Sequence, residues 1–222
     1  NIDEIFKPEN KSIKQIFGDT DAFYQMPIYQ RPYSWDKERV EQLWYDILEA
    51  FKNNSEDDNI DPNYFLGSVV VVKKPTYFEV VDGQQRLTTL TILFCTLRDL
   101  NLEISQKNII SNSIKDLVES KERLKLTTHL NNQALFEETV VKGINFNATK
   151  KEISENRFLQ TALFFKDLIL KTLNKEHEDY VNDFGKFVDY LFNKTTMIKI
   201  VCFDEGFAIK LFTVLNDRGL DL

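Results

Sequence analysis

Hydrophobic residues repeat along the chain with two different periods, and these periods separate the expected helices from the expected strands. Residues 40–51 carry apolar side chains three and four positions apart, which is the spacing of one helical face. Residues 65–72 form a continuous run rich in β-branched residues, typical of a buried strand. A second apolar run at residues 77–81 follows after a short turn, so we expect an antiparallel hairpin.

The helical period returns after this hairpin and then dominates. A helix is expected from Gly83 to about Leu100, and further periodic stretches lie at 135–141, 158–173, 180–192 and 206–215. Strand-like runs occur at 123–126 and, more clearly, at 197–203. The pattern predicts an α+β fold with two regions. Residues 1–101 are expected to form a core of strands and helices, and residues 102–222 a mainly helical region, with one late strand, packed on that core.

The segment before residue 40 has a different character. A short helix is expected at residues 12–17, with Ser12 as the N-cap and Gly18 as the stop. Residues 23–35 combine prolines with many aromatic residues, so they should be extended and lie on the core.

Composition narrows the class of protein. The chain has 222 residues and a net charge of −7, which excludes a broadly basic nucleic-acid-binding surface. Two separated cysteines form no metal-binding pair and indicate a reducing cytoplasm. No apolar run approaches the ~18 residues of a membrane span, so no membrane partner is expected. Because the chain starts at Asn1 and ends directly after a motif, we expect a fragment of a longer protein.

The most informative motif is the run Asp82-Gly83-Gln84-Gln85-Arg86, between a predicted strand and a predicted helix. Free backbone N–H groups and the helix dipole favour an anion at such a junction. Arg86 adds a planar set of donors that suits phosphate, and the two glutamines add amide donors. Three roles stay open for Asp82: helix cap, partner of Arg86, or ligand of a bridging Mg²⁺. The spacing is not that of a Walker P-loop.

Two further clusters contain similar donors. Gln30 and Arg31 precede a proline and could reach the same phosphates from rigid extended backbone. Aromatic residues beside them, Tyr29, Tyr33 and Trp35, could stack on a base or could simply pack on the core. Near the end of the chain, Asn216 and Arg218 stand where the last helix stops. Neither a nucleophile with a nearby base nor a set of metal ligands is recognisable from spacing.

These clusters, in this order, resemble the N-terminal domain of GmrSD-type modification-dependent restriction enzymes, a ParB/sulfiredoxin-like family. The matching segments span nearly the whole chain: residues 28–35, 65–70, 81–90 and 212–222. The DGQQR segment is the specific one. The resemblance implies a ParB/sulfiredoxin-like core, which is a small mixed sheet with helices. It also implies binding and hydrolysis of an NTP (GTP favoured) with Mg²⁺, and sensing of modified phage DNA. In ParB relatives a GxxR segment at a helix start holds nucleotide phosphates, and Gly83 and Arg86 match that segment.

The resemblance also implies a nuclease partner. Members often carry a C-terminal His-Asn-His (HNH) nuclease domain, which would lie beyond Leu222 or on a partner subunit. We therefore expect a regulatory, NTP-hydrolysing and DNA-sensing domain, with Asp82, Gln84, Gln85 and Arg86 as catalytic candidates. Gly83, Arg86, Gln30, Arg31, Asn216 and Arg218 are the nucleotide-binding candidates, and Tyr29, Tyr33 and Trp35 the nucleic-acid-binding ones. Alternatives are a non-catalytic DNA- or phosphate-binding module and a DNA-nicking domain. A homodimer is compatible with the sequence.

Overall fold

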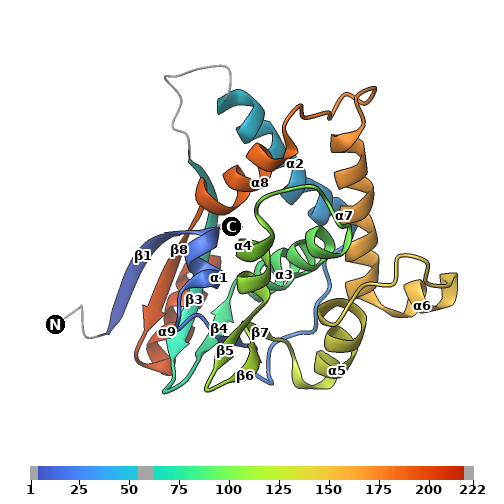
Figure 1. The fold of residues 1–222 in the computed structure, drawn as a ribbon. Coiled ribbons are helices and arrows are strands. Elements are labelled where there is room, and N and C mark those ends of the chain that lie inside the picture. Colours follow the sequence, from blue (N-terminus) through green and yellow to red (C-terminus); the bar gives the residue numbers. More distant parts are fainter. Residues whose placement is uncertain (1–4, 55–62, 218–222) are drawn as a thin grey trace.

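A mixed six-stranded sheet forms the centre of the computed structural model, which describes residues 5–54 and 63–217 (Figure 1). The strand order is β1-β8-β3-β4-β2-β7. Strands β3 and β4 form an antiparallel hairpin, as predicted, whereas β8 runs parallel to β3 and antiparallel to β1. The bounds are β1 Phe6–Ser12, β2 Tyr24–Gln25, β3 Tyr64–Lys73, β4 Phe78–Asp82, β7 Leu126–Thr127 and β8 Thr195–Cys202, and a separate hairpin contains β5 Lys115–Val118 and β6 Lys121–Leu124.

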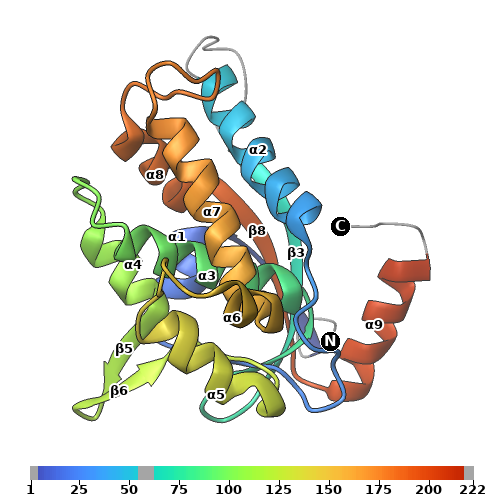
Figure 2. The same cartoon turned by 90° about the vertical axis from the view of Figure 1, so that its right-hand side faces the viewer.

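Helices cover the two faces of the sheet unequally. On one side, α1, α3, α4 and α7 enclose the main core, while α9 is the one helix of the described residues on the other side (Figure 2). Many of the 18 phenylalanines of the chain pack in the main core, often edge to face. The helical bounds are α1 Ile13–Gly18, α2 Lys37–Asn54, α3 Gln84–Asp99, α4 Lys107–Ile114, α5 Gln133–Phe136, α6 Lys150–Glu155, α7 Arg157–Leu173, α8 Phe184–Asn193 and α9 Glu205–Asp217; short 3₁₀ and π turns lie at Leu130–Asn132 and Glu137–Val141.

The α+β class, the mixed sheet and the mainly helical second half are confirmed. So is the short helix capped by Ser12, whose hydroxyl accepts from the Gln15 amide. The late strand has an unexpected place, because β8 lies between β1 and β3 in the sheet. Residues on both sides of the predicted division near residue 101 therefore contribute strands to the sheet. The helix expected from residue 180 starts only at Phe184, where Asp183 is the N-cap.

The hydrophobic pattern of the sequence did not predict strand β1. Its sequence, Phe6–Ser12, is mostly polar and contains a proline, which fits an edge strand that pairs on one side only. Among the described residues, no helix is long and apolar enough to cross a membrane.

Candidate functional site

The turn from β4 into α3 has the geometry of an open helix N-terminus. Gly83 is the N-cap residue, with a left-handed φ of +93°, and no side chain caps the helix. A Cβ there would lie 3.2 Å from Val69 Cγ2 and 3.3 Å from the Ser68 carbonyl oxygen. Both the left-handed backbone and this close packing therefore require glycine. Asp82 is thus not the N-cap. Within residues 5–54 and 63–217, no side chain accepts from the first amide N–H groups of α3, which leaves these groups available to an anion.

Arg86 lies in the first turn of α3 and is partly buried against β3. Its Nη1 donates to the Ser68 carbonyl oxygen at 3.3 Å, its one hydrogen bond in the described structure. The guanidinium lies against Gly67, where a Cβ would come within 3.1 Å of Nη1. Burial lowers the pKa of Arg86, while the nearby Asp82 and Tyr64 oppose this shift. No carboxylate of the described residues forms an ion pair with it, so most of its donors are unpaired.

Asp82 carries a carboxyl group whose charge acts on this guanidinium. Burial raises the pKa of its carboxyl group, and the Gly83 N–H and the charge of Arg86 counteract part of that rise. Close by, Ser68 is 7% exposed, and its Oγ is buried without a hydrogen-bond partner in the described part of the chain. A buried hydroxyl without a partner costs about 1–3 kcal/mol, and each such group calls for an explanation.

Three glutamines connect the extended segment to the start of α3. Gln30 Nε2 donates to the Val81 carbonyl oxygen (2.8 Å), and Gln84 Nε2 donates to Gln30 Oε1 (2.8 Å). Gln85 is buried; its Oε1 accepts from the Ser34 amide (2.8 Å) and its Nε2 donates to the Pro32 carbonyl oxygen (3.2 Å). The structure therefore brings Gln30, Gln84 and Gln85 together. Both ends of the Gln85 amide are used to hold the chain, whereas Gln84 Oε1 has no hydrogen-bond partner within the described ranges.

The aromatic residues of this segment differ in their surroundings. Tyr33 stacks on Phe158, and its hydroxyl lies 2.9 Å from Thr89 Oγ1 and 3.1 Å from Thr161 Oγ1. Burial raises its pKa to about 12. Trp35 packs against the main core. Both rings thus have structural contacts, while Tyr29 is 60% exposed.

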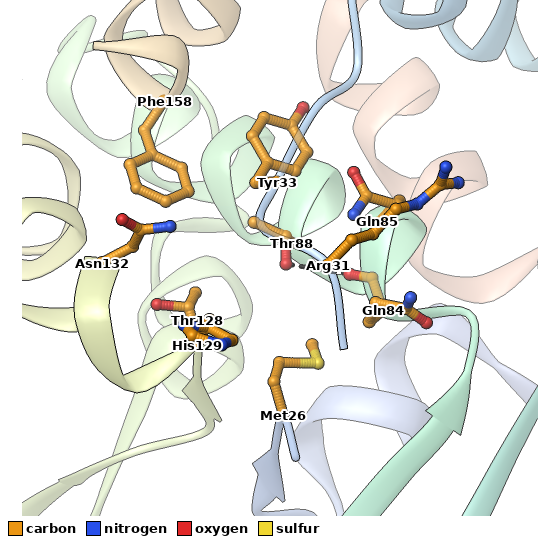
Figure 3. A pocket seen from close by; sticks show the side chains of 10 residues that line it. All are labelled: Met26, Arg31, Tyr33, Gln84, Gln85, Thr88, Thr128, His129, Asn132 and Phe158. Carbon is orange, nitrogen blue, oxygen red and sulfur yellow. Dashed lines mark hydrogen bonds between the residues drawn. The ribbon is translucent and has the colours of Figure 1, made fainter. Parts of the chain in front are cut away.

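A narrow crevice lies beside the first turn of α3, between it and the helical region (Figure 3). Arg31, Gln84 and Gln85 form one wall, and Thr128, His129 and Asn132 form the other. Its open volume of about 10 Å³ corresponds to roughly one water molecule. Arg31 is exposed and makes no hydrogen bond or ion pair with the described residues.

Helix α9 brings the end of the chain toward the same end of the sheet. Lys74 Nζ lies 3.8 Å from a carboxylate oxygen of Glu205, which places the start of α9 at the β3–β4 turn. Leu211, Phe212 and Leu215 then pack on the cluster that contains Val70 and Val81. The helix therefore runs in the direction of β4, and the exposed Asn216 lies toward the end where β4 meets α3. Arg218 lies outside the described residues.

The family model described as "GmrSD restriction endonuclease, N-terminal domain" matches residues 13–222. The chain belongs to this family. The comparison with curated proteins gave no match. The GmrSD N-terminal domain identified here thus comes from a family of restriction endonucleases, and the motif-based resemblance is confirmed at that level.

Residues of the GmrSD domain that the motif analysis missed are Gly67 and Ser68, which form the floor under Arg86. One signal was present. An isolated glycine inside a β-branched run suggests a bulge or a close approach, and the register of β3 against β8 shifts between Phe65 and Ser68. Tyr64 was also missed; burial and the nearby charge of Asp46 on α2 raise its pKa to about 12, and it lies near enough to Arg86 to influence the pKa of that guanidinium.

Proposed function

We propose that this GmrSD N-terminal domain binds the phosphates of a nucleoside triphosphate at the β4–α3 turn and hydrolyses it. The observation that carries the proposal is Arg86, a partly buried guanidinium with one hydrogen bond of 3.3 Å and no ion pair in the described structure. An incompletely paired charge costs free energy unless a ligand neutralises it. Phosphate oxygens are suited to a planar guanidinium, and the uncapped N-terminus of α3 adds backbone donors beside it.

Catalysis in this proposal is electrostatic. Arg86 stabilises negative charge that develops on the phosphate groups, and the amides at the start of α3 hold the phosphates in place. Gln84 Oε1 accepts no hydrogen bond from the described residues, so it can orient the attacking water. Gln30 positions Gln84 through their hydrogen bond, and Gln85 keeps the extended segment against α3. Asn216 and Arg218 remain candidates for the phosphates or sugar.

A magnesium ion fits this donor set. Mg²⁺ binds through one or two carboxylates together with substrate phosphates and water, and Asp82 supplies one carboxylate at the turn. Ser68 Oγ, which has no hydrogen-bond partner among the described residues, is a second oxygen near Arg86 that could serve as a ligand. When bound, the ion would neutralise charge on the phosphates. The described residues contain no cluster of three or more metal-binding side chains, which agrees with an ion held mainly by its nucleotide.

We further propose that nucleotide turnover regulates a nuclease, carried by an HNH domain or by a partner subunit, in response to modified phage DNA. The exposed segment around Ile28 (75% exposed) and Tyr29, next to Arg31, offers a cation and apolar surface for a nucleic acid. Membership in a restriction endonuclease family favours this setting.

The test is a calorimetric titration of the protein with GTP, ATP and other nucleotides in the presence of Mg²⁺, together with phosphate-release assays. Arg86→Ala should weaken binding at least tenfold and abolish turnover, because one charge-assisted hydrogen bond is worth about 1.5–3 kcal/mol. Lys14→Ala, which removes an exposed cation on α1, is the control and should leave both unchanged. Equal affinity and turnover in Arg86→Ala and wild type would refute the assignment. DNA binding without any nucleotide binding would favour the non-catalytic alternative.

A further inference from the structure

Phe65 is a large aromatic residue on the central strand β3 that is left 49% exposed. The parallel register pairs it with Thr196 of β8, and the same face of β3 carries Ser68 and Val70 farther along. Val70 belongs to the cluster under α9, so Phe65 projects on the α9 side of the sheet. Helix α9 covers Val70 but leaves half of Phe65 uncovered.

The exposed Phe65 lies close, along β3, to the residues that support Arg86. Gly67, the floor under the guanidinium, is two residues away, which corresponds to roughly 7 Å along a strand. The unpartnered Ser68 Oγ lies on the same face of β3 as Phe65. A nucleotide extends from its phosphates through the sugar to the base. With the phosphates at Arg86, its base can therefore reach the Phe65 ring.

We propose that Phe65 is the stacking surface for the nucleobase of the bound nucleoside triphosphate. This inference rests on the proposed function, since it takes the phosphates to be at Arg86. A phenyl ring offers a π-face to every base without hydrogen-bonding atoms that discriminate between bases. Phe65 thus contributes affinity for nucleosides in general, and selection among bases belongs to other residues.

Tyr29, the exposed aromatic candidate from the extended segment, does not lie beside Phe65. Burial raises the pKa of Tyr29, and the nearby charges of Glu79 of β4 and Glu205 of α9 add to this rise. Glu205 is at the start of α9, beside the β3–β4 turn, while Phe65 lies at the opposite end of β3. The two aromatic residues therefore serve different regions of the surface.

The experiment compares a nucleotide with its phosphate part alone. Calorimetric titrations with GTP, ATP and inorganic tripolyphosphate, all with Mg²⁺, are made on wild type, Phe65→Ala, Arg86→Ala and the control Phe203→Ala. Phe203 is also 49% exposed but follows the far end of β8. Phe65→Ala should weaken GTP and ATP by roughly 5- to 150-fold and leave tripolyphosphate unchanged. Arg86→Ala should weaken all three, and Phe203→Ala none.

A second variant reports stacking directly. Phe65→Trp should bind nucleotides, and its indole fluorescence should be quenched by GTP or ATP but not by tripolyphosphate. Unchanged nucleotide affinity in Phe65→Ala, or an equal loss for nucleotides and tripolyphosphate, would overturn the stacking assignment while leaving the phosphate site intact. If Arg86→Ala binds tripolyphosphate as wild type does, the proposed phosphate site itself fails. The two failures are thus distinguishable.

Discussion

Replacing Gly67 with alanine perturbs the support of Arg86 without touching its charge. Gly67 has a φ of +124°, a conformation that residues with a Cβ rarely adopt. The added methyl group would lie 3.1 Å from Nη1 and 3.3 Å from Cζ and Nη2 of Arg86. The guanidinium must therefore move, and the backbone of β3 must accept strain at its bulge.

The two effects have different sizes and different readouts. Holding a non-glycine residue in such a region costs about 1–3 kcal/mol, which corresponds to a fall in Tm of roughly 2–12 °C for a domain of this size. A shift of the guanidinium also weakens its contact with any bound phosphate. Geometric displacement of one charge-assisted hydrogen bond should raise the Kd for a nucleoside triphosphate by about tenfold.

Thermal unfolding and calorimetric titration separate these effects if Gly143→Ala is made in parallel. Gly143 also has a positive φ, +156°, but a Cβ there would meet no atom within 4 Å. The control should thus lose stability without losing nucleotide affinity. The reasoning about β3 would be wrong if Gly67→Ala unfolded at the wild-type temperature. The role assigned to Gly67 under Arg86 would be wrong if affinity fell no further than in Gly143→Ala.

Three further predictions concern buried polar groups. Lys199 is 2% exposed with Nζ 3.6 Å from the Phe78 ring centroid, and burial lowers its pKa to about 8. In the unfolded chain this lysine keeps its proton to higher pH. The free energy of unfolding of the wild type, relative to that of Lys199→Met, should therefore rise by about 2 kcal/mol between pH 7 and 9.5. Urea titrations measure this, and a difference that stays constant with pH would contradict it. Tyr33→Phe removes a hydroxyl bonded to two threonines while keeping the ring, so it should lower the free energy of unfolding by about 1–2 kcal/mol in the same assay. An unchanged urea midpoint would contradict this. Gln85→Leu should speed hydrogen exchange at the Ser34 amide at least tenfold, since that amide loses its acceptor; unchanged exchange would show that other contacts hold the segment.

Local chemistry in the sequence was sufficient to place most elements. The β-branched run of β3, the short turn and the second apolar run specify a hairpin whatever surrounds them. Ser12 caps α1 through contacts that span only three residues. The motif from Asp82 to Arg86 likewise lies at a strand–helix junction, as its residue order indicates. Interactions over a few residues leave a periodic or compositional trace, and such traces can be read directly.

Contacts between distant segments were decided only by the tertiary structure. Strand β8, 195–202, enters the sheet beside β3, although more than 120 residues separate it from the start of β3. The sequence made Gln85 a catalytic candidate, and only the structure shows its amide bonded to the Ser34 amide and the Pro32 carbonyl oxygen. Gly67 and Ser68 form the floor under Arg86, and neither glycine nor serine by itself indicates an anion site in a sequence. Burial and pairing depend on what the whole chain packs against each group, so they have no signature in local sequence.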